Sequence, residues 1–409
     1  MSMSSKSPPR LGGNRHQRPA RAYRARLSTP CQSPGRGSSV DLHYHEGPAM
    51  PIKNPPTWPP IHRARRLMLA AGEVRDYWHK WFNAVDLWKI TKGEGVNVAV
   101  LDTGIDEAHQ CFKDGAIVKA IDCTGDRRFG YRDRNGHGTF CASVLGGRGD
   151  LQGVAPKCNL FVYKVLNNRG EGTGQDIARG IDQAVADGCH IVSMSLGSDF
   201  PDPQIQAAFK RAIAARRIMV AAAGNAGGID TVGYPAAWAG HGAAGLDCIA
   251  VGAIDEFGQL APFSSTGDQV DTVAPGARVL GAAVGGGYIR RDGTSMATPL
   301  VAGGLACAVA HHLKAGNHAT PLETTAEARE HIKRSAKDAG QPGEDDEYGW
   351  GYFDPLTLVR NDIATPLEPA PVERQTITLP TPWGPVTIGM PALPTDKAQI
   401  DVGTIGFNW

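Results

Sequence analysis

The chain has 409 residues, of which 41% are hydrophobic and 20% are charged, and its formal net charge at pH 7 is +1. This length allows one large domain or two average ones, and the balanced charge argues against a generally basic nucleic-acid-binding protein. No apolar run is long enough for a membrane span, and no apolar stretch follows the first basic residues as in a secretory signal. Eight cysteines are scattered without a Cys-x-x-Cys pair, which predicts free thiols and no zinc site.

The first 40 residues carry one Lys and seven Arg, and neither Asp nor Glu. They are also rich in Ser, Pro and Gly, a composition that cannot bury a core. We therefore predict that residues 1–75 form a basic tail, disordered or resembling a prosegment. An Arg-rich start without acidic residues also resembles an organelle transit peptide, and a weak contact with a polyanion is a third interpretation. Without a secretory signal we expect a cytoplasmic location, with organelle targeting as the alternative.

Regular structure is first predicted over residues 76–90. Trp78, Phe82 and Val85 recur there at helical spacing, which indicates one amphipathic lead-in helix. Short apolar strands then alternate with helices, which predicts an α/β fold with a mostly parallel sheet covered by helices on both faces. The predicted elements are a strand at 96–101, a helix at 175–187, a strand at 191–196, a helix at 204–216 and a strand at 218–223.

The chain becomes Pro-rich again after about Asn361. We expect residues 76–360 to form the folded domain and residues 361–409 to form a C-terminal extension. Within this extension, the stretch TITLPTPWGPVTIGM alternates apolar and polar residues around a Pro/Gly turn, which predicts a hairpin.

Four polar residues are candidates for the catalytic side chains of the predicted domain. Asp102 and Asn225 follow predicted strands, and active sites of such sheets gather at the carboxyl ends of strands. His137 stands between two glycines, and Ser295 begins a helix of small residues. Each alone is more often structural than catalytic, but a serine nucleophile needs a base and a group that orients that base. The set predicts that Asp102 orients His137, which takes the proton of Ser295. The Ser295 backbone N–H and the Asn225 side-chain amide would then stabilise the oxyanion.

The four stretches that hold these residues, VLDTGID, NGHGT, AAAGN and GTSMATP, resemble the signature blocks of the subtilisin-like serine proteases, the subtilases. They occur in the same order, and the resemblance extends over about residues 85–360. It implies a subtilisin-like three-layer fold, an acyl-enzyme mechanism and an extended peptide bound between two protein edges. It also implies substrate-binding positions in GEGTGQ, SMSLGS and TVGYPA, namely Gly172, Gly174, Ser195, Leu196, Gly197 and Gly233. A glycine at the base of the specificity pocket implies a preference for large apolar residues before the scissile bond.

Some positions depart from the family pattern. Phe140 replaces the usual second histidine, and Cys141 follows it as in proteinase K-like members, which implies sensitivity to mercurials unless the thiol is inert in the core. Cys111 replaces a calcium-binding aspartate, and the loop after the histidine helix is short, so we expect the usual strong calcium site to be missing. We predict no cofactor, and calcium at another site stays open. A long stretch after the pocket base, AWAGHGAAGLDC, predicts a surface loop in which His241 faces solvent.

The sequence thus predicts a serine endopeptidase that acts on proteins or peptides. A dedicated processing protease for one partner or precursor is the alternative. A peptide-binding pseudoprotease is disfavoured because all four chemical groups are present. The related sedolisins use Glu as the base and Asp to stabilise the oxyanion. This chain has His137 and Asn225 instead, so the sedolisin interpretation is excluded. The first 85 residues lack the pattern of a folded inhibitory propeptide. Two alternatives follow: the tail blocks the cleft as a short segment, as in intracellular members, or the enzyme is active as soon as it folds.

Overall fold

The computed structural model describes residues 39–40, 74–125, 128–239, 246–315, 322–364, 375–379 and 386–390. All of them belong to one unit of the chain, Ser38–Trp409. Most of the predicted tail, His241 with the centre of the inserted loop, and most of the predicted C-terminal extension lie outside the described residues. The predictions for those segments therefore stay predictions.

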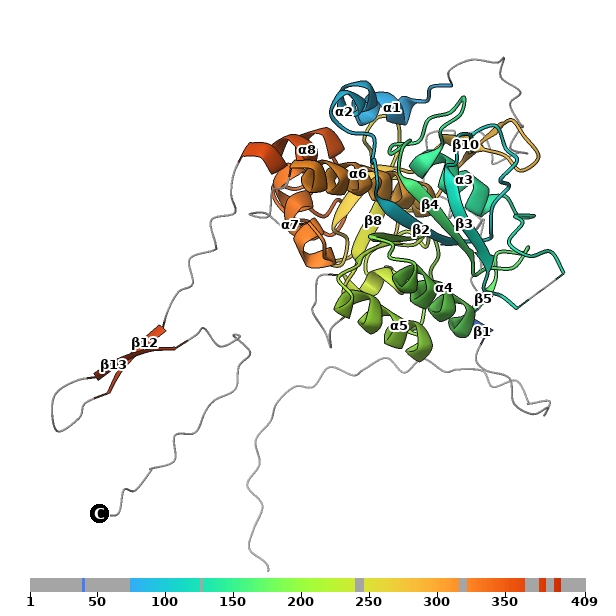
Figure 1. Cartoon of the computed structure of the whole chain (residues 1–409). Helices are drawn as coiled ribbons and strands as arrows, with labels where there is room; N and C mark the ends of the chain where they lie inside the picture. The colour runs from blue at the N-terminus through green and yellow to red at the C-terminus, as the bar shows by residue number, and fades with distance from the viewer. Residues whose placement is uncertain are drawn as a thin grey trace, which may run out of the picture. The chain divides into compact units, whose positions relative to one another are not determined.

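A parallel sheet of seven strands forms the centre of the domain, in the order β3-β4-β2-β6-β7-β8-β9 (Figure 1). Every neighbouring pair runs parallel, as predicted. The chain builds β3 and β4 on one side of β2 and then β6 to β9 on the other, so the direction of winding switches between β2 and β6. A crevice for ligands forms at the carboxyl ends of strands beside such a switch. The strands are β2 Asn97–Asp102, β3 Ile117–Asp122, β4 Asn159–Lys164, β6 Ile191–Met194, β7 Ile218–Ala222, β8 Ile249–Ile254 and β9 Thr272–Pro275.

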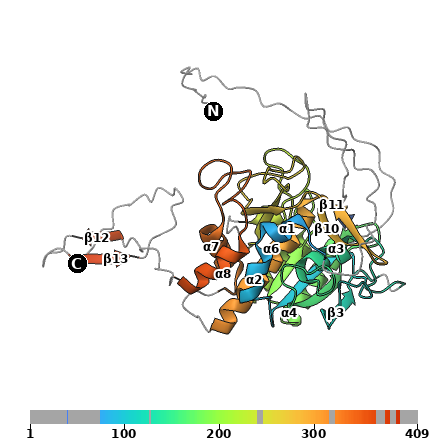
Figure 2. The same cartoon turned by 90° about the horizontal axis from the view of Figure 1, so that it is seen from above.

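Helices cover both faces of this sheet and give three layers (Figures 1 and 2). One core cluster joins the sheet to α3 (His137–Gly146) and α6 (Thr294–Ala315), and α7 (Thr325–Ser335) and α8 (Pro355–Ala364) add to it. A second cluster joins the other face to α4 (Gly174–Ala186), α5 (Pro203–Ala214) and the 3-10 turn η1 (Ala236–Trp238). The predicted subtilisin-like three-layer α/β fold is confirmed.

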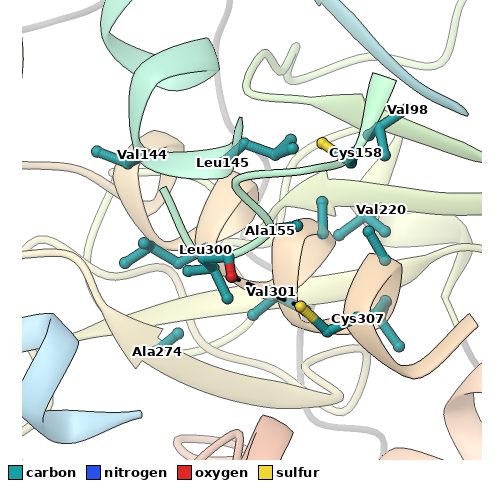
Figure 3. Packing of buried hydrophobic residues seen from close by; sticks show 14 of the residues in the cluster. Val98, Val144, Leu145, Ala155, Cys158, Val220, Ala274, Leu300, Val301 and Cys307 are labelled. Carbon is teal, nitrogen blue, oxygen red and sulfur yellow. Dashed lines mark hydrogen bonds between the residues drawn. The ribbon is translucent and has the colours of Figure 1, made fainter. Parts of the chain in front are cut away.

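Strand side chains alternate between the two core clusters. Val98 and Val100 of β2 point to the α6 face, whereas Ala99 and Leu101 point to the α4 face. This is the period of two that a β-strand imposes, and here both faces are buried. Figure 3 shows the α6 side of this core, where Val98 lies among apolar side chains from several elements.

Helix α6 is unusual in length and composition. Its segment Thr294–Lys314 is the one helix, among the described residues, that is long and apolar enough to cross a membrane. In this fold 89% of its apolar window is buried inside the protein. The apolar character therefore belongs to a core helix that packs against the sheet, and its first turn carries Ser295.

The lead-in segment differs from the prediction. A single helix over 76–90 was expected, but the chain forms α1 (Tyr77–Trp81) and α2 (Ala84–Ile90). Asn83 separates them with φ of +49°, a left-handed conformation that asparagine tolerates better than most residues and that interrupts the helical spacing. Trp78 and Phe82 are fully buried, but Val85, beyond the break, is 54% exposed. The prediction of a single helix is wrong. The prediction that Val85 lies on the same apolar face as Trp78 and Phe82 is wrong as well.

Three short antiparallel pairs complete the described structure. β5 (Gly172–Thr173) pairs with β1 (Ser39–Val40), and β10 (Val279–Ala282) pairs with β11 (Tyr288–Arg291). β12 (Gln375–Leu379) pairs with β13 (Val386–Met390), which confirms the hairpin predicted in the C-terminal extension.

Candidate active site

The four residues predicted to carry the chemistry come from four different elements. Asp102 is the last residue of β2, and His137 is the first residue of α3. Ser295 is the second residue of α6, and Asn225 follows β7 by three positions. Asp102 is fully buried, and His137 and Ser295 are each 4% exposed. A charged group at such depth needs a partner, so the contacts of each residue decide what it can do.

Asp102 and His137 form a hydrogen-bonded pair. His137 Nδ1 lies 2.8 Å from Asp102 Oδ1 and 3.0 Å from Oδ2, and it donates because an ionised carboxylate can only accept. The Thr103 N–H also donates to Asp102 Oδ1 at 2.7 Å. Burial lowers the pKa of His137, but the Asp102 charge and hydrogen bond outweigh it, so the pKa of His137 is raised. These contacts offset the cost of burying the Asp102 carboxylate and leave Nε2 as the ring nitrogen that can accept a proton.

Cys141 connects His137 to Ser295. Its Sγ lies 3.8 Å from His137 Nδ1 and donates to the Ser295 carbonyl oxygen at 3.5 Å. Ser295 and Ser195 are joined twice, because Ser195 Oγ donates to the Ser295 carbonyl at 2.8 Å and Ser295 Oγ donates to the Ser195 carbonyl at 3.3 Å. The start of α6 is thus held between the histidine helix and the segment that follows β6.

Asn225 is held by the start of α6. Its Oδ1 accepts the Thr294 N–H at 2.9 Å and the Thr294 hydroxyl at 3.0 Å, which fixes the side-chain oxygen and directs the NH₂ group elsewhere. A Cβ added at Gly293 would lie 3.4 Å from Asn225 Nδ2 and 3.6 Å from the Ser295 N. The space that Gly293 leaves empty therefore lies beside two N–H donors.

The segments predicted to form the specificity pocket converge beside this site. Ser198 and Tyr234 exchange two backbone hydrogen bonds of 2.8 Å, and Gly233 N donates to the Ala223 carbonyl at 2.9 Å. Ser195, Leu196 and Gly197 lead into Ser198, so the three segments at 195–198, 223–225 and 233–235 are adjacent. A Cβ added at Gly233 would lie 3.2 Å from the Ser198 carbonyl oxygen, a tight contact with the neighbouring segment.

Gly172 and Gly174 lie at the other predicted edge of the substrate cleft. A Cβ at Gly172 would lie 2.7 Å from Leu166 Cδ2, and a Cβ at Gly174 would collide with the Asp202 carboxylate. In this structure the close approaches at these two glycines are therefore to protein atoms. The backbone of β5, which contains Gly172, pairs antiparallel with Ser39–Val40.

The cysteines are free thiols throughout the described part of the chain, as predicted. Cys111 is fully buried, and burial raises the pKa of its thiol to about 12. Cys141 is 1% exposed, and burial raises the pKa of its thiol as well. The ligand atoms of Asp102, His137 and Cys141 all lie within 4.8 Å of one another, close enough for a metal ion, but Asp102 and His137 are already hydrogen-bonded to each other.

Two supporting residues were not predicted. Thr294 fixes the Asn225 oxygen, and Asp133 accepts hydrogen bonds from both sides of the histidine helix start. The sequence contained a signal for Asp133, since an acidic residue shortly before a helix start is a common cap. No comparable signal marked Thr294, because its contact with Asn225 depends on how two distant segments meet.

The fold thus brings a buried Asp–His pair close to a serine at a helix start. Residues 93–351 match the subtilase family. The chain belongs to the subtilase family, and it is a subtilisin-like serine endopeptidase.

Named relatives are similar over the same region. The intracellular serine protease of Paenibacillus polymyxa is 39% identical over 230 residues, which are 54% of this chain and 68% of the relative. The major intracellular serine protease of Bacillus subtilis is 37% identical over 238 residues, 56% of this chain and 72% of the relative. The minor extracellular protease Epr of Bacillus subtilis is 33% identical over 270 residues, 65% of this chain but only 39% of the relative.

Proposed function

We propose that the protein hydrolyses peptide bonds through an acyl-enzyme, with Asp102, His137 and Ser295 as its catalytic residues. Ser295 Oγ attacks the scissile carbonyl carbon, and its proton passes to His137 Nε2. The tetrahedral intermediate places its negative oxygen beside Asn225 Nδ2 and the Ser295 N–H. Collapse breaks the C–N bond, and the His137 proton leaves with the amine. Water, deprotonated by His137, then hydrolyses the ester and restores Ser295.

The observation that carries this proposal is the pair of hydrogen bonds, 2.8 and 3.0 Å, between His137 and the buried Asp102 carboxylate. This pair fixes the imidazole orientation and stabilises the imidazolium that forms during attack. The Cys141 contacts support the proximity of His137 to Ser295. In the resting arrangement the Ser295 hydroxyl donates to Ser195, so it must turn toward His137 before it attacks.

We further propose a preference for large apolar residues before the scissile bond. The Ser195–Gly197 segment and the Gly233 segment lie side by side, and neither contains Lys, Arg, Asp or Glu. A charged side chain would lose hydration there without gaining a partner, whereas a large apolar side chain gains free energy on burial.

The substrates we propose are proteins or peptides, and we place the enzyme in the cytoplasm. The names of the Paenibacillus polymyxa protease and of one Bacillus subtilis protease call them intracellular, which supports this location, whereas the name of Epr calls it extracellular. The pairing of Ser39–Val40 with Gly172–Thr173 supports a cleft-blocking role for the segment before the domain, since it occupies the edge to which a substrate strand would add.

Replacement of the nucleophile tests the catalytic proposal. Ser295→Ala should remove hydrolysis of an unstructured protein such as casein and of a peptide ester, while the fold and melting temperature stay close to the parent values. Ser335→Ala is the matched control, because Ser335 is also buried but donates only within α7, to the His331 carbonyl at 2.8 Å. Full hydrolysis by the Ser295 variant would assign the nucleophile elsewhere. A parent protein that binds peptides but never cleaves them would favour the pseudoprotease alternative.

A further inference from the structure

Asp133 is a buried carboxylate to which the proposed mechanism assigns no role. It is 4% exposed and lies four residues before His137, in the loop that leads into α3. Its Oδ1 accepts the Thr103 hydroxyl at 3.0 Å, the Asn135 N–H at 2.9 Å and the Gly136 N–H at 2.8 Å. Its Oδ2 accepts the Thr139 N–H at 2.9 Å and the Thr139 hydroxyl at 2.7 Å. One carboxylate therefore receives five donors.

These donors come from both elements that carry the Asp–His pair. Thr103 follows Asp102 directly, and its N–H donates to Asp102 Oδ1 at 2.7 Å. The Thr103 hydroxyl also accepts the Gly138 N–H at 2.9 Å, next to His137. Asp133 and Thr103 thus satisfy the second and third N–H groups of α3, which a helix start leaves without internal acceptors. The end of β2 and the start of α3 are fixed to the same carboxylate.

The charge state of Asp133 follows from its surroundings. Burial alone raises the pKa of a carboxyl group, but the donors from Gly136, Thr139 and Thr103 outweigh burial and hold the pKa of Asp133 below its usual value. The ionised form is the one that five donors require, because it has acceptor sites only. An amide in its place would offer one oxygen and would turn an NH₂ group toward N–H or O–H donors.

We infer that Asp133 is a positioning residue for the reaction, which holds His137 and Asp102 in register by capping α3 and binding Thr103. This inference rests on the proposed peptidase function. Asp133 does not touch the reacting atoms, so its effect passes through the Asp102–His137 hydrogen bonds. Misplacement of a catalytic group by about 1 Å can cost roughly 100-fold in rate.

The first experiment compares Asp133→Asn with the parent enzyme on a peptide substrate. We expect kcat to fall roughly 10- to 100-fold with the KM little changed, because the base acts in the transition state. We also expect the acid limb of the kcat/KM profile to move to lower pH. A looser hydrogen bond to Asp102 stabilises protonated His137 less. The other titratable group that faces this ring is Cys141, whose thiol pKa is raised by burial and which the Asp133→Asn substitution leaves in place.

Asp354→Asn is the matched control. Asp354 is 5% exposed, precedes α8, and accepts the N–H and hydroxyl of Thr357 at 3.0 and 2.9 Å, as Asp133 does with Thr139. It lies outside the proposed site, so its replacement lowers the melting temperature without moving the acid limb. If Asp133→Asn changes kcat and the acid limb no more than this control does, the inference is wrong.

If the Asp133→Asn variant does not fold, the Thr103→Val variant is measured in its place. Valine keeps the shape of the fully buried Thr103 but removes the hydroxyl that joins Asp133 to the Gly138 N–H. Its kcat should fall and its acid limb should shift in the same direction, and Thr103→Ser, which keeps the hydroxyl, should restore both. Equal profiles for the valine and serine variants would overturn the inference. A parent enzyme that neither cleaves peptides nor reacts with a fluorophosphonate would instead refute the proposed function.

Discussion

The starts of α3 and α6 each hold one residue of the proposed catalytic set, but they are built differently. At α3 the helix N–H groups are satisfied by side chains, with Asp133 and Thr103 accepting from Thr139 and Gly138. At α6 the Asn225 oxygen takes the Thr294 N–H, and Gly293 leaves space beside the Ser295 N–H and the Asn225 NH₂ group.

The difference matches what each helix start must do. The base must keep one orientation, so the N–H groups around His137 are bound to fixed acceptors. In the proposed mechanism the substrate oxygen becomes negative when Ser295 attacks the carbonyl carbon, so the start of α6 must offer N–H donors to that oxygen. At the start of α3, N–H groups bound to side chains give rigidity. At the start of α6, N–H groups left for the substrate would bind the negative oxygen.

The largest effect should follow from removing the side-chain donor at the α6 start. Asn225→Ala should lower kcat roughly 10²- to 10³-fold with little change in KM, a magnitude measured on subtilisin and carried over by family resemblance. Asn159→Ala is a matched control. Asn159 donates to Asn97 at 2.9 Å, and this pair lies at the ends of the strands that are opposite to the proposed site. A loss confined to KM would show that Asn225 binds substrate and does not stabilise the transition state.

Changes in the proposed specificity pocket beside the α6 start should give a smaller effect on activity. Burial of a Phe or Leu side chain is worth roughly 1.5–3 kcal/mol, so we expect about tenfold or more faster cleavage after Phe or Leu than after Ala. Gly233→Val presses on the Ser198 carbonyl and narrows the pocket, so it should shift preference to small residues while Ser295 still reacts with a small probe. A peptide-library profile dominated by charged residues at this position would contradict the proposed pocket.

The α3 start makes a prediction about pH. His137 must be neutral to accept the Ser295 proton, so activity rises as pH passes the pKa of His137. Because the Asp102 charge raises that pKa, the midpoint of the acid limb of kcat/KM should lie above about 6.5, the ordinary histidine value. Rate measurements from pH 5 to 10 check this, and a midpoint below 6.5 would mean that desolvation of His137 outweighs Asp102.

The smallest effect should come from calcium removal. The family resemblance places Cys111 where many members have a calcium-binding aspartate. Cys111 is a buried thiol with a raised pKa, and calcium prefers oxygen ligands. We expect EDTA to change the melting temperature by less than about 2 °C, the shift that roughly 1 kcal/mol produces in a domain of this size. A saturable rise in melting temperature on adding calcium would reveal a site elsewhere in the chain.

Local patterns predicted the parallel sheet, three of its seven strands (β2, β6 and β7) and the helices α4 and α5. Apolar runs marked the strands, and Asp102, His137, Asn225 and Ser295 occurred in recognisable blocks. The break at Asn83 was missed because helical spacing continued across it and a left-handed asparagine has no signature in the apolar pattern. The roles of Thr294 and Thr103 were missed because their partners lie 69 and 35 residues away, at Asn225 and Gly138, and only the fold brings them together.

In the mechanism that we propose, Ser295 is the nucleophile and is activated by His137, which Asp102 orients. Fluorophosphonate treatment of the parent protein, followed by peptide mass mapping, tests it most directly. We expect one adduct, on Ser295, with loss of peptidase activity in step with labelling, and no adduct in the His137→Ala variant. Activity that persists after complete labelling, or an adduct on a different serine, would contradict it.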